Sequence, residues 1–271
     1  MAEFTNELIK WLGGGHSPWH TVDMAARWLT ERGFEPLALN KPFSVHRGGR
    51  YFVENGTFLA AVTVGQKDVI RIAAAHTDWP CMRIKPQPEL ISGGCCRLSV
   101  EPYGGAIYNT WLDRPLSLAG VVLVRTADPM RPERRLVAWD RPLLTIPNLA
   151  IHMNREVNKG VELNRQTDLL PICGLTDGAQ NADYFLNFLA KELQVEKQDI
   201  LDFELTVYNK EKPQYVGLAD ELISASRLDN LNSCSALVSA IIDSQRTDGM
   251  NVIALFDHEE IGSHSKQGAG S

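Results

Sequence analysis

Four ionisable side chains follow one short apolar run near the end of the sequence. Residues 252–256 (VIALF) are typical of a buried strand, and Asp257, His258, Glu259 and Glu260 come directly after it. In open α/β sheets, ligands bind beyond the carboxyl ends of the strands. Of two adjacent carboxylates at such a place, one can bind a cation while the other accepts a proton from water. An exposed acidic loop without a function is the commoner explanation of an isolated Glu-Glu pair, so neighbouring motifs have to decide.

A histidine follows a second apolar run in the same way. Residues 69–75 are predicted to form a strand, and His76 and Asp78 come immediately after it. A neutral imidazole binds a divalent metal ion, and a carboxylate two residues later can accept its other N–H and fix the ring. A His-x-Asp triplet is common by chance, so its position at a strand end is what favours a metal site.

Asp229 is a third candidate for binding a metal ion. It precedes residues 231–244, whose small and apolar side chains predict a buried helix. A carboxylate there could bridge two metal ions ~3.5–4 Å apart, as in two-metal aminopeptidases. Asp is also a favoured N-cap residue, and for Asp229 considered alone that alternative stays open. The order of the three motifs along the chain is more specific than any one of them.

The elements that must position these residues form two kinds of pattern. Before Pro86 the sequence predicts helices at 4–12 and 21–32 and a hairpin of strands 51–54 and 57–64 around Asn55-Gly56. After Pro86, short strand-like pieces separated by Pro, Gly and Asp predict a β-rich unit inserted into an α/β scaffold. We therefore expect a first catalytic segment at 1–86, the insert at 87–220 and a second catalytic segment at 221–271. Inside the insert we predict strands at 97–101, 119–126, 135–138 and 200–208, a helix at 182–193 and a mobile loop at 158–177.

Composition limits the classes of function. The chain has 271 residues, of which 44% are hydrophobic and 22% charged, and its net charge is -6, which fits a soluble globular protein. It has no basic patch for nucleic acid and no apolar run of the ~18 residues that span a membrane. Its N-terminus lacks a signal-peptide pattern, and its five cysteines lack paired zinc-ribbon spacing, so we expect a cytoplasmic protein with reduced thiols. Cys95 and Cys96 could bind a soft metal, but thiols packed in a strand are the commoner explanation.

Five segments along essentially the whole chain resemble the M18 metallopeptidases, the aspartyl-aminopeptidase-like family. In order they are AAAHTDWPCMRIKP, YGGAIYNTWLDRPLSLAG, IPNLAIHMNR, SASRLDNLNSC and FDHEEIGSHSKQGA. The resemblance implies a doubly wound, zinc-exopeptidase-like α/β domain interrupted by a β-rich dimerisation domain. It also implies two Zn²⁺ ions per active site, peptide substrates and a homo-oligomer.

The resemblance assigns a role to each candidate residue in the catalytic domain. His76 and Glu260 would be zinc ligands, and Asp229 would bridge the two ions. Glu259 would be the general base, and Asp78 would hold His76 in place.

His152 would act differently, because it lies in the insert. By the resemblance, this histidine of the IPNLAIHMNR segment reaches into the active site of a neighbouring subunit and stabilises the tetrahedral intermediate. Without the resemblance, His152 would be interpreted as an ordinary histidine in a strand.

The function implied is a zinc-dependent aminopeptidase that removes N-terminal residues, with acidic residues as the expected preference. A related two-zinc carboxypeptidase or deacylase shares the order of the metal-site motifs but has no counterpart to the two insert motifs. Members of the M18 family continue beyond FDHEEIGS and carry their remaining zinc ligands, an aspartate and a histidine, in that later part. We therefore expect either a fragment of a longer protein or a catalytically incomplete chain, such as a non-catalytic assembly subunit.

Overall fold

The computed structural model describes residues 2–176, 183–245 and 247–271. The chain divides into two compact units, Met1–Trp79 with Lys212–Ser271, and Pro80–Glu211. Both structural divisions fall earlier in the chain than the boundaries expected at 86 and 220. The first does so because Pro86 lies within a strand, Cys81–Ser92, that belongs entirely to the second unit.

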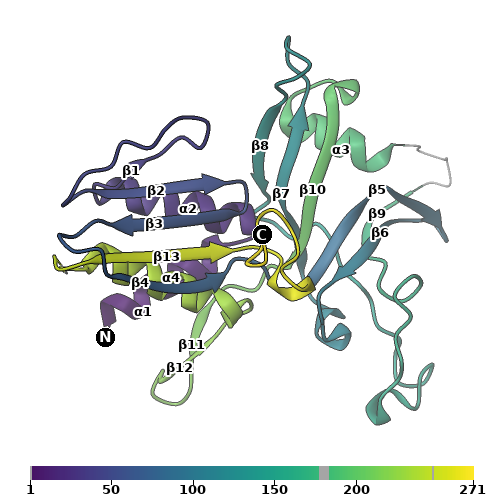
Figure 1. Cartoon of the computed structure of the whole chain (residues 1–271). Coiled ribbons are helices and arrows are strands. Elements are labelled where there is room, and N and C mark those ends of the chain that lie inside the picture. The colour runs from purple at the N-terminus through teal and green to yellow at the C-terminus, as the bar shows by residue number, and fades with distance from the viewer. Residues whose placement is uncertain (1, 177–182, 246) are drawn as a thin grey trace. The chain divides into compact units, whose positions relative to one another are not determined.

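A five-stranded sheet organises the first unit, in the order β1-β2-β3-β13-β4 (Figure 1). Its strands are β1 (Glu35–Pro36), β2 (Arg50–Asn55), β3 (Phe58–Thr63), β4 (Ile70–His76) and β13 (Met250–Phe256). The hairpin predicted around Asn55-Gly56 is confirmed, since β2 and β3 pair antiparallel up to Asn55 and Phe58. Gly56 has φ 70°, and a Cβ there would lie 3.3 Å from the Trp19 ring, so glycine suits this turn best.

The last strand of the sequence lies inside this sheet. β13 pairs parallel with β4 and antiparallel with β3, so the sheet is mixed; a buried apolar run such as 252–256 is more typical of a strand with parallel neighbours. The hairpin explains the difference, because it places β3 antiparallel beside β13. Phe256 pairs with His76, so both apolar runs end at the same edge of the sheet.

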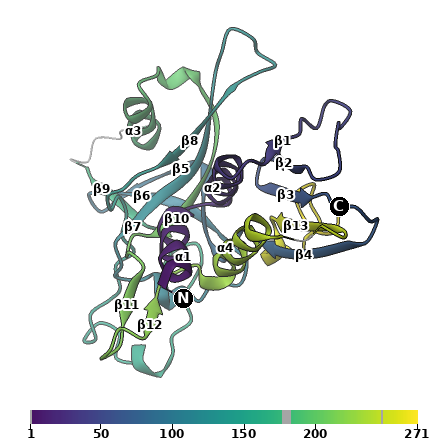
Figure 2. The same cartoon turned by 90° about the vertical axis from the view of Figure 1, so that its left-hand side faces the viewer.

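Three helices cover one face of this sheet (Figures 1 and 2). They are α1 (Ala2–Gly14), α2 (Pro18–Glu31) and α4 (Leu228–Asp243). Helix α2 begins at Pro18, before the start predicted at residue 21: the Ser17 hydroxyl accepts a hydrogen bond from the His20 backbone N–H, and Pro18 occupies the first turn. The core between helices and sheet contains Trp11, Val22, Ala25, Leu29, Phe34, Phe52, Leu59, Ala61, Val238, Ile253 and Leu255. The first unit also contains a separate hairpin of β11 (Gln214–Val216) and β12 (Leu222–Ser224).

The second unit is built on a six-stranded sheet in the order β8-β7-β10-β5-β6-β9. Its strands are β5 (Cys81–Ser92), β6 (Cys95–Tyr103), β7 (Leu116–Val124), β8 (Glu133–Ala138), β9 (Ile172–Leu175) and β10 (Ile200–Asn209), and its helix is α3 (Tyr184–Leu193). The expected helix at 182–193 matches α3, although Ala182 lies outside the described residues. The expected loop at 158–177 is only partly a loop, because β9 joins the sheet beside β6; Asp177 also lies outside the described residues.

The unit is β-rich, and the adjacent cysteines Cys95 and Cys96 both lie in β6, where Cys96 is buried. No helix in the described part of the chain is long and apolar enough to cross a membrane.

Candidate metal centre

The ends of β4 and β13 are tied together by one threonine. Thr77 follows His76, and its backbone N–H donates to the carbonyl of Phe256 at 2.7 Å. Its buried hydroxyl lies 3.1 Å from that same carbonyl and 3.1 Å from the carbonyl of Thr57, at the β2-β3 turn. The segments that carry the candidate residues are therefore held side by side by backbone and side-chain hydrogen bonds.

Asp78 fastens the two candidate segments to each other. Its side chain is 1% exposed, and its two carboxylate oxygens accept the backbone N–H groups of Glu259 and Glu260, each at 3.2 Å. Asp78 Oδ1 also lies 3.3 Å from His76 Nδ1, and its backbone carbonyl lies 3.0 Å from the same nitrogen. The carboxylate expected to orient the imidazole thus also holds the short 3-10 helix Glu259–Ile261.

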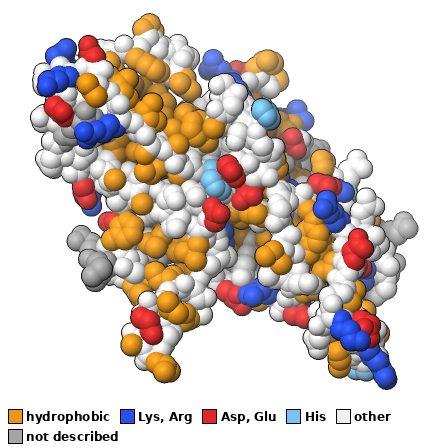
Figure 3. Space-filling view, turned by 60° about the horizontal axis from the view of Figure 1, so that its bottom comes forward, with side chains coloured by type: hydrophobic (Ala, Val, Ile, Leu, Met, Phe, Trp, Pro, Cys, Tyr) orange, Lys and Arg blue, Asp and Glu red, His pale blue; other side chains and the backbone are white. Residues whose placement is uncertain are grey.

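Three side chains converge in front of this support. One ligand atom each from His76, Glu259 and Glu260 can be chosen so that all lie within 4.8 Å of one another. Asp229 lies beside them, with its Oδ1 3.3 Å from His76 Nε2. Imidazole nitrogen and carboxylate oxygen are the donors that zinc binds in proteins, so this donor set fits the expected metal. A histidine with acidic side chains beside it is visible on the surface in Figure 3.

Asp229 lies at the start of α4, where its side chain faces His76. Asp229 (φ −82°, ψ 113°) and Asn230 are not helical, and the peptide bond between them is cis. The Asp229 carboxylate accepts a hydrogen bond from the Asn230 side chain at 3.1 Å and faces His76. The Asp229 carboxylate thus lies beside the other candidate ligands.

The crowding of charges shifts two pKa values in the cluster. Burial alone would lower the pKa of His76, but its hydrogen bond to Asp78 and the charges of Asp78 and Glu259 raise it above the ordinary value. Burial raises the pKa of Glu260, and the negative charges of Asp78, Glu259 and Asp229 raise it further against the opposing effect of His76. A site in which carboxylates repel one another in this way is one that a bound cation would stabilise.

Several supporting residues were not predicted from the sequence. The Asn230 side chain accepts the His76 N–H at 3.4 Å, and the Cys234 thiol donates to the His76 carbonyl at 3.1 Å. His258 does not join the cluster of ligand atoms; its ring lies 2.6 Å from the Ser265 hydroxyl and 3.4 Å from Asp257. The position of Asn230 next to Asp229 was a signal that could have been used, whereas nothing in the sequence marks Cys234.

The sixth predicted residue, His152, lies in the second unit, apart from the five that belong to the first. It is exposed, in a turn that follows the IPNLA segment. Asp113 holds this segment: its carboxylate accepts the Asn148 N–H at 2.9 Å, and its own N–H donates to the Ile146 carbonyl at 2.9 Å. The two insert motifs singled out in the sequence therefore lie side by side.

Comparisons with known proteins show which family the chain belongs to. The model of the aminopeptidase I zinc metalloprotease family (M18) matches residues 11–271. A probable M18 family aminopeptidase 2 of Clostridium novyi is 41% identical over 276 residues, which cover 99% of this chain and 64% of that protein. Aspartyl aminopeptidase 4 of Saccharomyces cerevisiae is 38% identical over 305 residues, covering 100% of this chain and 62% of that protein.

Among solved structures, a chain of the Ape4 and Nbr1 complex superposes with a TM-score of 0.93 at 32% identity, covering 100% of this chain and 57% of that one. The chain thus spans a little under two thirds of the length of the curated relatives it matches. It has the mixed α/β, zinc-exopeptidase-like fold of those structures with a β-rich unit inserted. Sequence, fold and cluster together place the chain in the M18 family of zinc metalloproteases.

Proposed function

We propose that this chain forms the metal centre of a zinc-dependent aminopeptidase that removes single residues from the N-termini of peptides. The observation that carries the proposal is the convergence of His76, Glu259 and Glu260, with Asp229 beside them, in front of the buried Asp78. The name of the yeast relative, an aspartyl aminopeptidase, supports acidic residues as the preferred substrates. We further propose two zinc ions, with His76 and Glu260 as ligands and Asp229 as the bridge.

Zinc, when bound at such a site, polarises the scissile carbonyl and lowers the pKa of water. The residues of the chain supply the rest. The Glu259 carboxylate, whose side chain is 56% exposed, takes the proton from the attacking water and returns it to the leaving amine. Asp78 keeps that carboxylate in position through the backbone of Glu259, and it keeps the imidazole of His76 oriented.

We propose that His152 completes the site of a second copy of this chain by donating a hydrogen bond to the developing oxyanion. Its surroundings support a role in association, because apolar side chains near it in the sequence and in the neighbouring motif are exposed. These are Ile107, Leu149, Ile151 and Met153. Composition and five free cysteines support a cytoplasmic location as part of the same proposal.

The test combines elemental analysis with hydrolysis of chromogenic Asp, Glu and Leu substrates. Zinc near two per chain together with turnover would support the proposal. Glu259→Gln should abolish turnover and leave the zinc content unchanged, and Glu260→Gln should lose zinc. Glu54→Gln, in an exposed position on β2, is the matched control and should alter neither. Loss of zinc in Glu259→Gln would mean that the roles of the two glutamates are reversed.

Two other outcomes would favour the alternatives. Little zinc and no turnover, restored only in a longer form of the protein, would show that these residues alone are catalytically incomplete. Zinc binding with cleavage of C-terminal residues or acyl groups would favour the carboxypeptidase or deacylase. A monomer at all concentrations in size-exclusion chromatography would contradict the role of His152 in a partner's site.

A further inference from the structure

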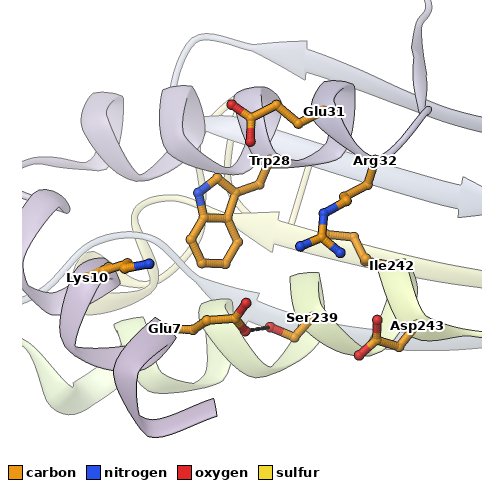
Figure 4. A pocket seen from close by; sticks show the side chains of 8 residues that line it. All are labelled: Glu7, Lys10, Trp28, Glu31, Arg32, Ser239, Ile242 and Asp243. Atoms are coloured by element: carbon orange, nitrogen blue, oxygen red, sulfur yellow. Dashed lines mark hydrogen bonds between the residues drawn. The ribbon is translucent and has the colours of Figure 1, made fainter. Parts of the chain in front are cut away.

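A polar pocket lies within the helical layer of the first unit and shares no residue with the candidate metal centre (Figure 4). It has a volume of about 240 Å³ and lies between α1, α2 and α4. Its lining consists of Glu7, Lys10, Trp28, Glu31, Arg32, Ser239, Ile242 and Asp243. The volume is below the ~300–1,000 Å³ typical of sites for drug-sized ligands, so the pocket suits a smaller molecule.

The pocket contains charges of both signs around one aromatic ring. Figure 4 shows Lys10 and Arg32 on opposite sides of the Trp28 ring, with the carboxylates of Glu7 and Asp243 below it. In the part of the chain that the structure describes, Lys10, Arg32 and Asp243 form no side-chain ion pair. Glu7 accepts only a long hydrogen bond, 3.4 Å, from the Ser239 hydroxyl.

The Trp28 ring is held in place from behind. It packs edge-on against Trp11, with centroids 5.6 Å apart and an interplanar angle of 82°, and Trp11 is completely buried. The Trp28 ring, fixed against Trp11, lies among positive and negative side chains that form no ion pair among the described residues. This arrangement suits a small molecule that has an apolar part, one positive group and one negative group.

We propose that this pocket binds a free α-amino acid. The planar guanidinium of Arg32 suits the α-carboxylate, the ammonium group faces Glu7 and Asp243, and the side chain rests on Trp28. A phosphate ester would be repelled by the three carboxylates of the lining, and a simple cation would leave Lys10 and Arg32 without a partner.

Amino acids are what the proposed aminopeptidase releases, so the natural source of the ligand rests on the proposed function. The binding itself does not. A pocket of this kind would let the protein bind a free amino acid at a site away from the reaction.

The test is isothermal titration calorimetry of the whole chain after treatment with a chelator, which keeps the ligand from binding through metal at the candidate centre. L-leucine should bind saturably. Leucinamide lacks the carboxylate and N-acetyl-L-leucine lacks the ammonium group, and each should bind at least about tenfold more weakly.

Variants locate the binding. Arg32→Gln and Asp243→Asn should each weaken the binding of L-leucine by about tenfold. Arg27→Gln is the matched control: Arg27 lies on the same helix, is exposed, and pairs with Asp23 at 2.8 Å outside the pocket. Arg32→Lys keeps the charge and should retain part of the affinity, which separates loss of binding from loss of folding.

Three results would overturn the proposal: no binding of L-leucine, equal binding of N-acetyl-L-leucine, or unchanged binding in both pocket variants. Because no turnover and no zinc enter the measurement, failure here would leave the proposed function standing. Failure of the proposed function would in turn leave the measured binding intact.

Discussion

The two regions that carry the proposed chemistry are held by the chain to very different degrees. The turn at Glu259 and Glu260 is fastened by a carboxylate that is 1% exposed, and the strand ends beneath it are joined through Thr77. The segment around His152 is anchored through Asp113, and its apolar side chains face solvent, with Met153 67% exposed. The first region is supported by hydrogen bonds from distant parts of its own unit, whereas the second presents apolar side chains to solvent.

The largest effect should come from removing a core side chain beneath the metal centre. Leu255 is fully buried in β13, close to the turn that carries the glutamates, so Leu255→Ala should lower the free energy of unfolding by about 4 kcal/mol and weaken zinc binding. Leu205→Ala, at an equally buried position of the second unit, should cost a similar amount of stability and leave zinc binding unchanged. Denaturant titration and zinc titration of both variants measure this. Equal loss of zinc in both would contradict the assignment of the centre to the first unit.

The second-largest effect should come from changing the buried carboxylate of Asp78. Asp78→Asn keeps the shape of the side chain but removes its charge and one of its two acceptors of backbone N–H groups. We expect a loss of about 3 kcal/mol of stability and a zinc affinity lower by about 10–100-fold. Asp23→Asn, on the exposed side of α2, is the control. An unchanged zinc affinity in Asp78→Asn would show that the turn is held by other contacts.

Acid should destabilise the first unit through His20. Burial, aided by the charge of Arg27, lowers the pKa of His20 from 6.5 to about 4. Above pH 6.5 the ring is neutral in both states, and this stability is fully present. As the pH falls from 6.5 to 4, only the unfolded chain takes up the proton, so about 3 kcal/mol should be lost.

His20→Gln should therefore show a shallower loss of stability than the parent between pH 6.5 and 4, as followed by denaturant titration at several pH values. Parallel curves for the two proteins would contradict the assignment.

The smallest effect should come from the anchor of the His152 segment. Asp113→Ala removes the acceptor of the Asn148 N–H, which should cost about 1 kcal/mol and speed up hydrogen exchange of that amide. The amides of Glu259 and Glu260 should exchange as before. If Asp113→Ala also changed the exchange of these two amides, the metal centre and the His152 segment would not be held independently of each other.

Much of the fold could be predicted from local patterns. The Asn55-Gly56 hairpin, the helices of the first unit and the two strands that end at His76 and Phe256 all follow from turn chemistry and periodicity, because their local preferences agree with the final structure. The strand β5 was missed, since Pro86 suggested a boundary within it. Its pairing explains how Pro86 and Pro88 are tolerated: β5 pairs with β10 at Met82 and Arg83, before the prolines, and its register with β6 shifts between Ile84 and Glu89, where both prolines lie.

The candidate site could be predicted only as far as residue types and strand ends allow. The carboxylate of Asp78 was expected beside His76, two residues away, and its role there is local. Its bonds to Glu259 and Glu260 join residues 181 and 182 positions apart, which no local pattern encodes. The same applies to Cys234 and its contact with the His76 carbonyl, 158 positions away.

The hydroxyl of Thr77 contacts a carbonyl 179 positions later in the chain, so this contact can form only when two distant segments have met during folding. Closing so long a loop lowers the conformational entropy of the chain before new contacts can offset that loss. The ends of β4 and β13 therefore meet late in folding. A chain that has formed only its hairpin and helices therefore has no metal centre. The proposed metal centre would then form only after the two segments of the first unit have folded together.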